Sequence, residues 1–129
     1  MKVKKVMKEI HQNSLEHGFW EDYKNIKNSI EDVELMNKSR KLGDKLEPTN
    51  EKAMLNNAIC TRLMLIVGEV SEAMEGLRKE DMPNFKEEIA DIIIRTFDLA
   101  EGLNIDLEVE IEKKMAINKD REYMHGKAF

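Results

Sequence analysis

A chain of 129 residues is the size of one ordinary domain, and its composition shows no break between two parts. The net charge of −5 argues against a general affinity for nucleic acid polymers, because such binding depends on basic side chains that neutralise phosphates. The N-terminus has no apolar signal region, and no run approaches membrane-spanning length, so we expect a soluble, cytosolic protein. Cys60, the one cysteine, lies in an apolar stretch and is expected to be a small core residue.

Hydrophobic residues make up 41% of the chain and charged residues 36%, with only two prolines and few aromatic residues. Helices favour this mixture of Glu, Lys, Met, Leu and Ile. We therefore predict an all-α fold, a single domain over residues 1–129 built as an antiparallel bundle of four to five helices. Such a bundle would leave apolar surface for a second subunit to cover.

Apolar residues recur at helical spacing from about residue 2 to 16, which predicts a first helix that Gly18 ends. The aromatic pair Phe19–Trp20 follows. A weaker pattern over residues 21–47 predicts a second amphipathic helix, whose tail, residues 38–50, is expected to form a loop.

The pattern sharpens from about residue 49, where a long helix is predicted to run to residue 78. Residues 63–67 are all apolar, so this stretch is expected to be enclosed on every side. The helix breaks at residues 81–84, where Pro83 suits the start of a fourth helix that ends near Gly102.

Asp106 is a reasonable N-cap for a last helix that runs to about residue 121. Leu107, Ile111 and Met115 share one side of this helix and are expected to face inward.

Two pairs of acidic residues lie on the third and fourth predicted helices. Residues three apart project from the same helix face, so Glu69 with Glu72, and Glu88 with Asp91, can each hold two carboxylates close together. The pairs are also symmetric about Glu80, where the chain is expected to reverse. An antiparallel hairpin would therefore bring all four carboxylates together between two otherwise apolar helices.

Carboxylates in an apolar setting need a proton, a cationic partner or a metal. A ligand set made only of oxygen atoms favours Mg²⁺, with Mn²⁺ as a substitute, and Mg²⁺ in turn favours a phosphorylated substrate. A single Glu-x-x-Glu is ordinarily a solvated face; two pairs symmetric about a turn are the stronger signal. Arg95, one turn beyond Asp91, could instead form an ion pair with one of these acids.

Lys114, Asn118 and Arg121 share one face of the last predicted helix and could bind phosphate oxygens, with Tyr123 just beyond them. Cations near a helix C-terminus also simply complement the helix dipole, which is the plainer reading. Trp20 could stack on a base, and a cap over the bundle core is an equal alternative.

Several of these motifs resemble the all-α nucleoside triphosphate pyrophosphatase superfamily, which includes MazG and the dimeric dUTPases. Residues 63–73 and 88–95 resemble its first and second motif helices, with Glu69-x-x-Glu72 and Glu88-x-x-Asp91 as the acidic signature. Residues 114–127 resemble the tail of small MazG-like members, and Gly18-Phe19-Trp20 resembles their N-terminal signature. Residues 21–54 match no motif of that group.

The resemblance implies a homodimer or homotetramer that binds Mg²⁺ and cleaves a nucleoside triphosphate between its α- and β-phosphates. Glu69, Glu72, Glu88 and Asp91 would be the metal ligands and catalytic acids, with one of them orienting the attacking water. The candidate substrate contacts are Lys114, Asn118, Arg121, Tyr123 and Trp20.

Two other functions fit parts of the pattern. In a non-catalytic helical interaction module, the acids would pair with Arg95 and with lysines across an oligomer interface. A carboxylate-bridged di-iron bundle would need Glu-x-x-His pairs, which the sequence lacks.

Overall fold

A computed structural model describes residues 2–46 and 50–121, and this part of the chain folds into helices with no strand. The elements are α1 (Val3–Glu16), α2 (Glu21–Asn37), a short 3-10 turn (Leu42–Asp44), α3 (Glu51–Arg78), α4 (Met82–Gly102) and α5 (Leu107–Lys119). The all-α prediction is confirmed, and the predicted helices agree with these bounds to within a few residues.

The chain reverses between α3 and α4 through a compact turn. Glu80 takes a left-handed conformation with φ of 56°, and the Asp81 N–H donates to the carbonyl of Gly76 at 2.8 Å, which closes the end of α3. The Asp81 carboxylate then caps α4 by accepting from the Asn84 N–H at 3.1 Å. Local sequence therefore fixes the hairpin at the predicted position.

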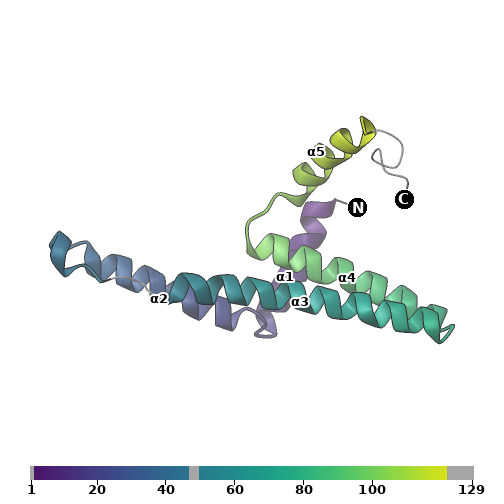
Figure 1. The fold of residues 1–129 in the computed structure, drawn as a ribbon, viewed down its shortest axis with the longest axis horizontal. Helices are drawn as coiled ribbons and strands as arrows, with labels where there is room; N and C mark the ends of the chain where they lie inside the picture. Colours follow the sequence, from purple (N-terminus) through teal and green to yellow (C-terminus); the bar gives the residue numbers. More distant parts are fainter. Residues whose placement is uncertain (1, 47–49, 122–129) are drawn as a thin grey trace.

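The other helices lie against this hairpin. α1 crosses α4, and α2 runs antiparallel beside the first half of α3 (Figure 1). α5 leans away from the hairpin and contacts α1, and an ion pair of 2.6 Å joins Lys4 of α1 to Asp106 at the start of α5. Asp106 also accepts from the Val109 N–H, which confirms the predicted N-cap.

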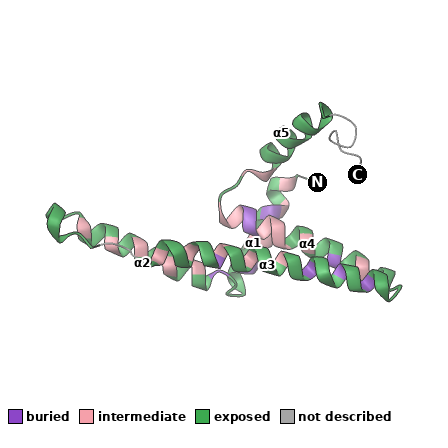
Figure 2. Cartoon of the chain, in the orientation of Figure 1, coloured by how far each residue is buried: buried purple, intermediate pink, exposed green. Residues whose placement is uncertain are grey.

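The predicted enclosure of residues 63–67 is wrong for the single chain. Leu63, Met64, Leu65 and Val67 are each about half exposed or more, and Figure 2 shows α3 largely exposed along its length. The buried positions of α3 in the hairpin are instead Ala73, Gly76 and Glu69, because α4 covers only that side. Most of the remaining side chains of the apolar stretch stay exposed, since no other helix in the described part of the chain covers them.

Two further expectations fail for the same reason. Ile111 and Met115 of α5 are exposed rather than inward-facing, and Cys60 is exposed on α3 rather than part of the core. By length and composition alone, α3 would also pass as a membrane span, contrary to expectation, although the core helices of water-soluble proteins pass the same test.

Candidate metal centre and adjoining cleft

Three carboxylates from two helices meet midway along the α3–α4 hairpin. Glu88 and Asp91 lie three residues apart on one face of α4, and Glu69 faces them from α3. One oxygen from each lies within 4.8 Å of the others. The hairpin therefore brings together three of the four acids singled out in the sequence.

Glu88 is the most enclosed member of this acidic cluster, with 8% of its surface exposed. Its Oε2 atom is buried and has no hydrogen-bond partner among the residues described. Burial raises the pKa of Glu88 above its ordinary value, and the neighbouring Glu69, Glu72 and Asp91 raise it further. A buried carboxylate with an unpartnered oxygen among other acids needs a proton or a cation.

Glu72 lies one turn beyond Glu69 on α3 but stays outside the close group. Its side chain is exposed, and its charge is near enough to contribute to the raised pKa of Glu88. The structure thus places Glu72 at the rim of the cluster.

Arg95 forms an ion pair with Glu69, as the plainer interpretation of the sequence anticipated. This contact neutralises one acid and leaves Glu88 and Asp91 without a cationic partner in the structure described. The oxygen donor set still fits a hard divalent cation such as Mg²⁺ or Mn²⁺, which binds through few carboxylates.

A cleft of about 790 Å³ opens directly beside the acidic cluster. Glu69, Asp91 and Arg95 line it next to the cluster, and its lining residues on α3 reach back to Thr61. Eight residues of α3 separate Glu69 from Thr61, which is roughly 12 Å at the helical rise. The remaining lining residues come from α1, the Gly18–Asp22 segment, α3 and α4: Glu9, Ile10, Asn13, Ser14, Gly18, Phe19, Asp22, Arg62, Leu65, Ile94, Asp98 and Leu99.

Asp98 on α4 holds α1 and the start of α2 in place at this cleft. Its carboxylate accepts hydrogen bonds from His11 Nδ1 at 2.6 Å, from Ser14 Oγ at 2.7 Å and from Trp20 Nε1 at 2.9 Å. His11 and Ser14 lie three apart on α1, so both reach Asp98 from one face. Sequence analysis missed this network, although Asp98 lies two turns beyond Asp91 on the same face of α4.

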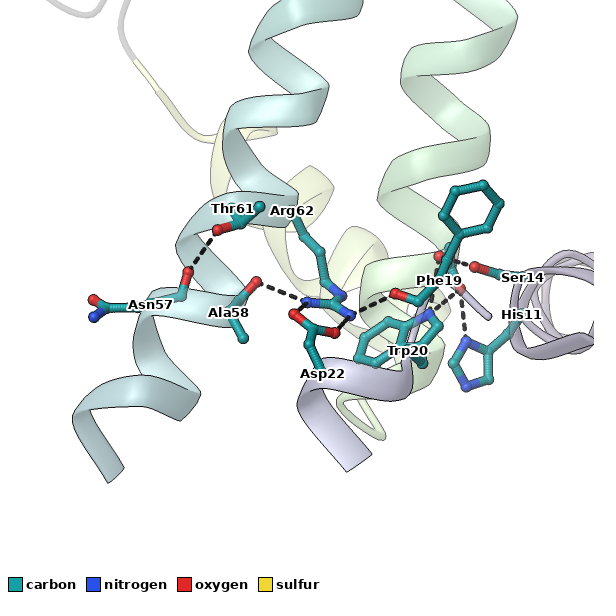
Figure 3. Close-up of polar contacts among 10 residues, drawn as sticks. His11, Ser14, Phe19, Trp20, Asp22, Asn57, Ala58, Thr61 and Arg62 are labelled. Carbon is teal, nitrogen blue, oxygen red and sulfur yellow. Dashed lines mark hydrogen bonds and ion pairs between the residues drawn. The ribbon is translucent and has the colours of Figure 1, made fainter. Parts of the chain in front are cut away.

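A second network fixes the Gly18–Asp22 segment against α3. Arg62 pairs with Asp22 at 2.7 Å and donates to the backbone carbonyls of Phe19 and Ala58 (Figure 3). Its guanidinium also lies over the Trp20 ring, 4.1 Å from the centroid, in cation–π geometry.

Trp20 is only 4% exposed, and its ring contacts the Arg62 guanidinium and the edges or faces of the His11 and Tyr23 rings. Within the chain described, it occupies the position of a cap over the packed helices, the alternative to base stacking. A contact between Trp20 and a base stays a prediction.

The predicted C-terminal substrate contacts lie elsewhere in the single chain. Lys114, Asn118 and Arg121 are exposed on or just after α5, and none of them lines the cleft. Tyr123 falls outside the described residues, so its placement stays untested.

Comparison with known proteins adds one finding. A model of the MazG-like family matches residues 64–128, half of the chain, including all four acids of the hairpin. Searches of curated proteins and of solved structures find no match. Because the matched region contains the acidic cluster and its two helices, the chain belongs to the MazG-like family.

Proposed function

We propose that this protein is a magnesium-dependent nucleoside triphosphate pyrophosphohydrolase that cleaves a nucleotide between its α- and β-phosphates. The family assignment supports hydrolysis of nucleoside triphosphates in general. The observation that carries the proposal is the buried Oε2 of Glu88, which has no partner among the described residues and lies beside Glu69 and Asp91, two acids that line a cleft. A divalent cation would satisfy this oxygen and would also draw a polyphosphate to the site.

The proposed reaction is direct attack by water. The water oxygen forms a bond to the α-phosphorus while the bond from that phosphorus to the bridging oxygen breaks. Pyrophosphate leaves with the bridging oxygen, the nucleoside monophosphate remains, and the water proton passes to a carboxylate. A bound Mg²⁺ would stabilise the charge that develops on the phosphate oxygens.

The acids take two roles in this proposal. Glu69, Glu88 and Asp91 hold the cation, because one oxygen from each lies within 4.8 Å of the others. Glu72 lies at the rim with an exposed side chain, so it is the acid free to orient the attacking water and to accept its proton.

The remaining assignments are also proposals. The cleft would hold the sugar and base, and Lys114, Asn118 and Arg121 would contact the phosphates only if α5 approaches a cleft, in its own chain or in a second copy.

We propose that a second copy of the chain covers the exposed apolar face of α3, since soluble monomers seldom expose so large a patch. The unpaired Cys60 fits a cytosolic setting, in which the enzyme would clear unwanted nucleotides.

The direct test is release of pyrophosphate from a panel of standard and modified nucleoside triphosphates with Mg²⁺. The wild type should release pyrophosphate from at least one of them. Asp91→Asn should lose both activity and Mn²⁺ binding, whereas Glu72→Gln should lose activity by about 10²-fold or more and still bind Mn²⁺. Glu75→Gln, on the exposed side of α3, is the control and should keep both.

The competing function is a non-catalytic interaction module, and the Arg95–Glu69 ion pair favours it. Such a module would bind neither Mn²⁺ nor a triphosphate, and no nucleotide in the panel would yield pyrophosphate. That result would contradict the enzymatic function and favour the interaction module.

A further inference from the structure

Among the described residues, the charged side chains that line the cleft beside the acidic cluster are mostly acidic, and two of them are cations, Arg62 and Arg95. The acids that line it are Glu9, Asp22, Glu69, Asp91 and Asp98. A polyphosphate carries more negative charge than one divalent ion neutralises, so binding it in this cleft calls for a cationic side chain as well.

Arg62 is fully occupied by the protein itself. Its two Nη groups donate to Asp22, to the carbonyl of Phe19 and to the carbonyl of Ala58, and its planar face covers Trp20. The side chain is 11% exposed. Turning Arg62 toward a ligand would break all of these contacts, so its role is to hold the cleft wall.

Arg95 has donors to spare. Only its Nε is engaged, with Glu69 Oε1, and neither Nη group has a partner in the part of the chain that the structure describes. The side chain is 39% exposed and lines the cleft, between Asp91 and Asp98 on the same face of α4. The planar guanidinium can therefore offer its Nη edge to a ligand in the cleft.

The Arg95–Glu69 contact also depends on the state of the acidic cluster. Among the described residues, Arg95 is the only basic side chain that forms an ion pair with a member of the acidic cluster, and that member is Glu69. A divalent ion bound to Glu69 would take over that neutralisation and weaken the hold of Glu69 on Arg95. Arg95 would then be free to pair with another anion beside the ion.

We propose that Arg95 is a substrate-binding residue of this cleft: it neutralises Glu69 in the metal-free protein and turns to the polyphosphate oxygens of the substrate when a divalent ion occupies the acidic cluster. This inference rests on the proposed function. It assigns to Arg95 the phosphate contact that α5 does not make within the single chain. A guanidinium can make that contact through two parallel hydrogen bonds, which an ammonium cannot.

The test is calorimetric and uses the full chain with two probes, Mn²⁺ alone and inorganic tripolyphosphate in saturating Mn²⁺. Arg95→Gln should bind Mn²⁺ as tightly as the wild type or more tightly, because it removes the competing cation. It should bind tripolyphosphate about 10- to 100-fold more weakly, as expected for the loss of a charge-assisted pair. Arg95→Lys should bind tripolyphosphate with an affinity between those of the wild type and Arg95→Gln. Arg78→Gln, a matched loss of charge on the exposed end of α3, should change neither Mn²⁺ binding nor tripolyphosphate binding.

Two results would overturn the inference. One is tripolyphosphate binding by Arg95→Gln within about twofold of the wild type, and the other is a parallel loss of Mn²⁺ and tripolyphosphate binding, which would mean that Arg95 only maintains the shape of the site. If Arg95→Gln does not fold, Arg95→Lys decides between the same outcomes. A wild type that binds no tripolyphosphate in Mn²⁺ would instead refute the proposed function itself.

Discussion

Trp20 lies directly over Gly102, so closely that a Cβ atom at position 102 would stand 2.2 Å from Cη2 of the indole ring. Real Cβ atoms essentially never approach another heavy atom so closely, and the ring cannot move freely because Asp98 holds its Nε1. The contact joins the end of α4 to the segment between α1 and α2. The absence of a side chain at residue 102 is therefore a condition for the buried position of Trp20.

Gly102→Ala should destabilise the protein by about 1–3 kcal/mol. Overpacking of this kind costs about 1–3 kcal/mol, and a displaced Trp20 also loses a hydrogen bond of about 1 kcal/mol, which together exceed the roughly 1 kcal/mol gained in helix propensity. Urea unfolding measures the change. In a Trp20→Leu background the same substitution should cost little, and an equal cost in both backgrounds would contradict the predicted clash.

Asp98→Ala should lower the free energy of unfolding by roughly 2–4 kcal/mol, since three donors on His11, Ser14 and Trp20 lose their shared acceptor. Chemical denaturation gives the value, and Mn²⁺ binding should be unchanged because Asp98 is not in the acidic cluster. Asp32→Asn, on the exposed surface of α2, is the control and should shift stability by less than about 0.5 kcal/mol. Equal effects of the two variants would refute the network's role.

The raised pKa of Glu88 gives the metal-free protein a defined pH dependence. Because the folded state binds the Glu88 proton more tightly than the unfolded state does, stability is highest below the unfolded pKa and falls as pH rises through the folded pKa. Glu88→Gln mimics the protonated form and should remove this fall, so it should be more stable than the wild type at pH 7 without metal. Thermal unfolding of both proteins in chelator, across pH 4–8, measures this difference. If the unfolding temperatures of the wild type and Glu88→Gln changed in parallel with pH, the raised pKa of a buried Glu88 would be contradicted.

The exposed apolar face of α3 predicts self-association through that face. Met64 is 64% exposed, so Met64→Glu should shift the protein toward monomer if a second copy covers α3, as light scattering after gel filtration would record. Leu42→Glu, at an 87% exposed position in the 3-10 turn, is the control and should not change the mass. A wild type that is monomeric at micromolar concentration would contradict the proposed cover of α3 by a second copy.

Local signals made the hairpin and most of the candidate site predictable. The caps at Asp81 and Asp106 and the three-residue spacing of Glu88 and Asp91 act within one or two helical turns, and the reversal near Glu80 then sets Glu69 opposite them. The enclosure of residues 63–67 was mispredicted because an apolar run does not tell whether its cover comes from the same chain.

The Asp98 network could not be predicted for a different physical reason. Its bonds join residues 78–87 positions apart, and they depend on where α1 crosses α4, which no local pattern encodes. The separation of α5 from the cleft could not be predicted either. The spacing of Lys114 and Arg121 puts both on one helix face, but it does not determine the direction in which that helix leaves α4.

Calorimetric titration of the nucleotide-free protein with Mn²⁺ tests the central claim most directly, because it asks only whether Glu69, Glu88 and Asp91 bind a divalent ion. The wild type and Glu75→Gln should bind Mn²⁺ alike, and Glu88→Gln and Asp91→Asn should bind it at least about tenfold more weakly with their helicity intact. Binding by Glu88→Gln as tight as that of the wild type would contradict the claim, as would a wild type that binds no Mn²⁺.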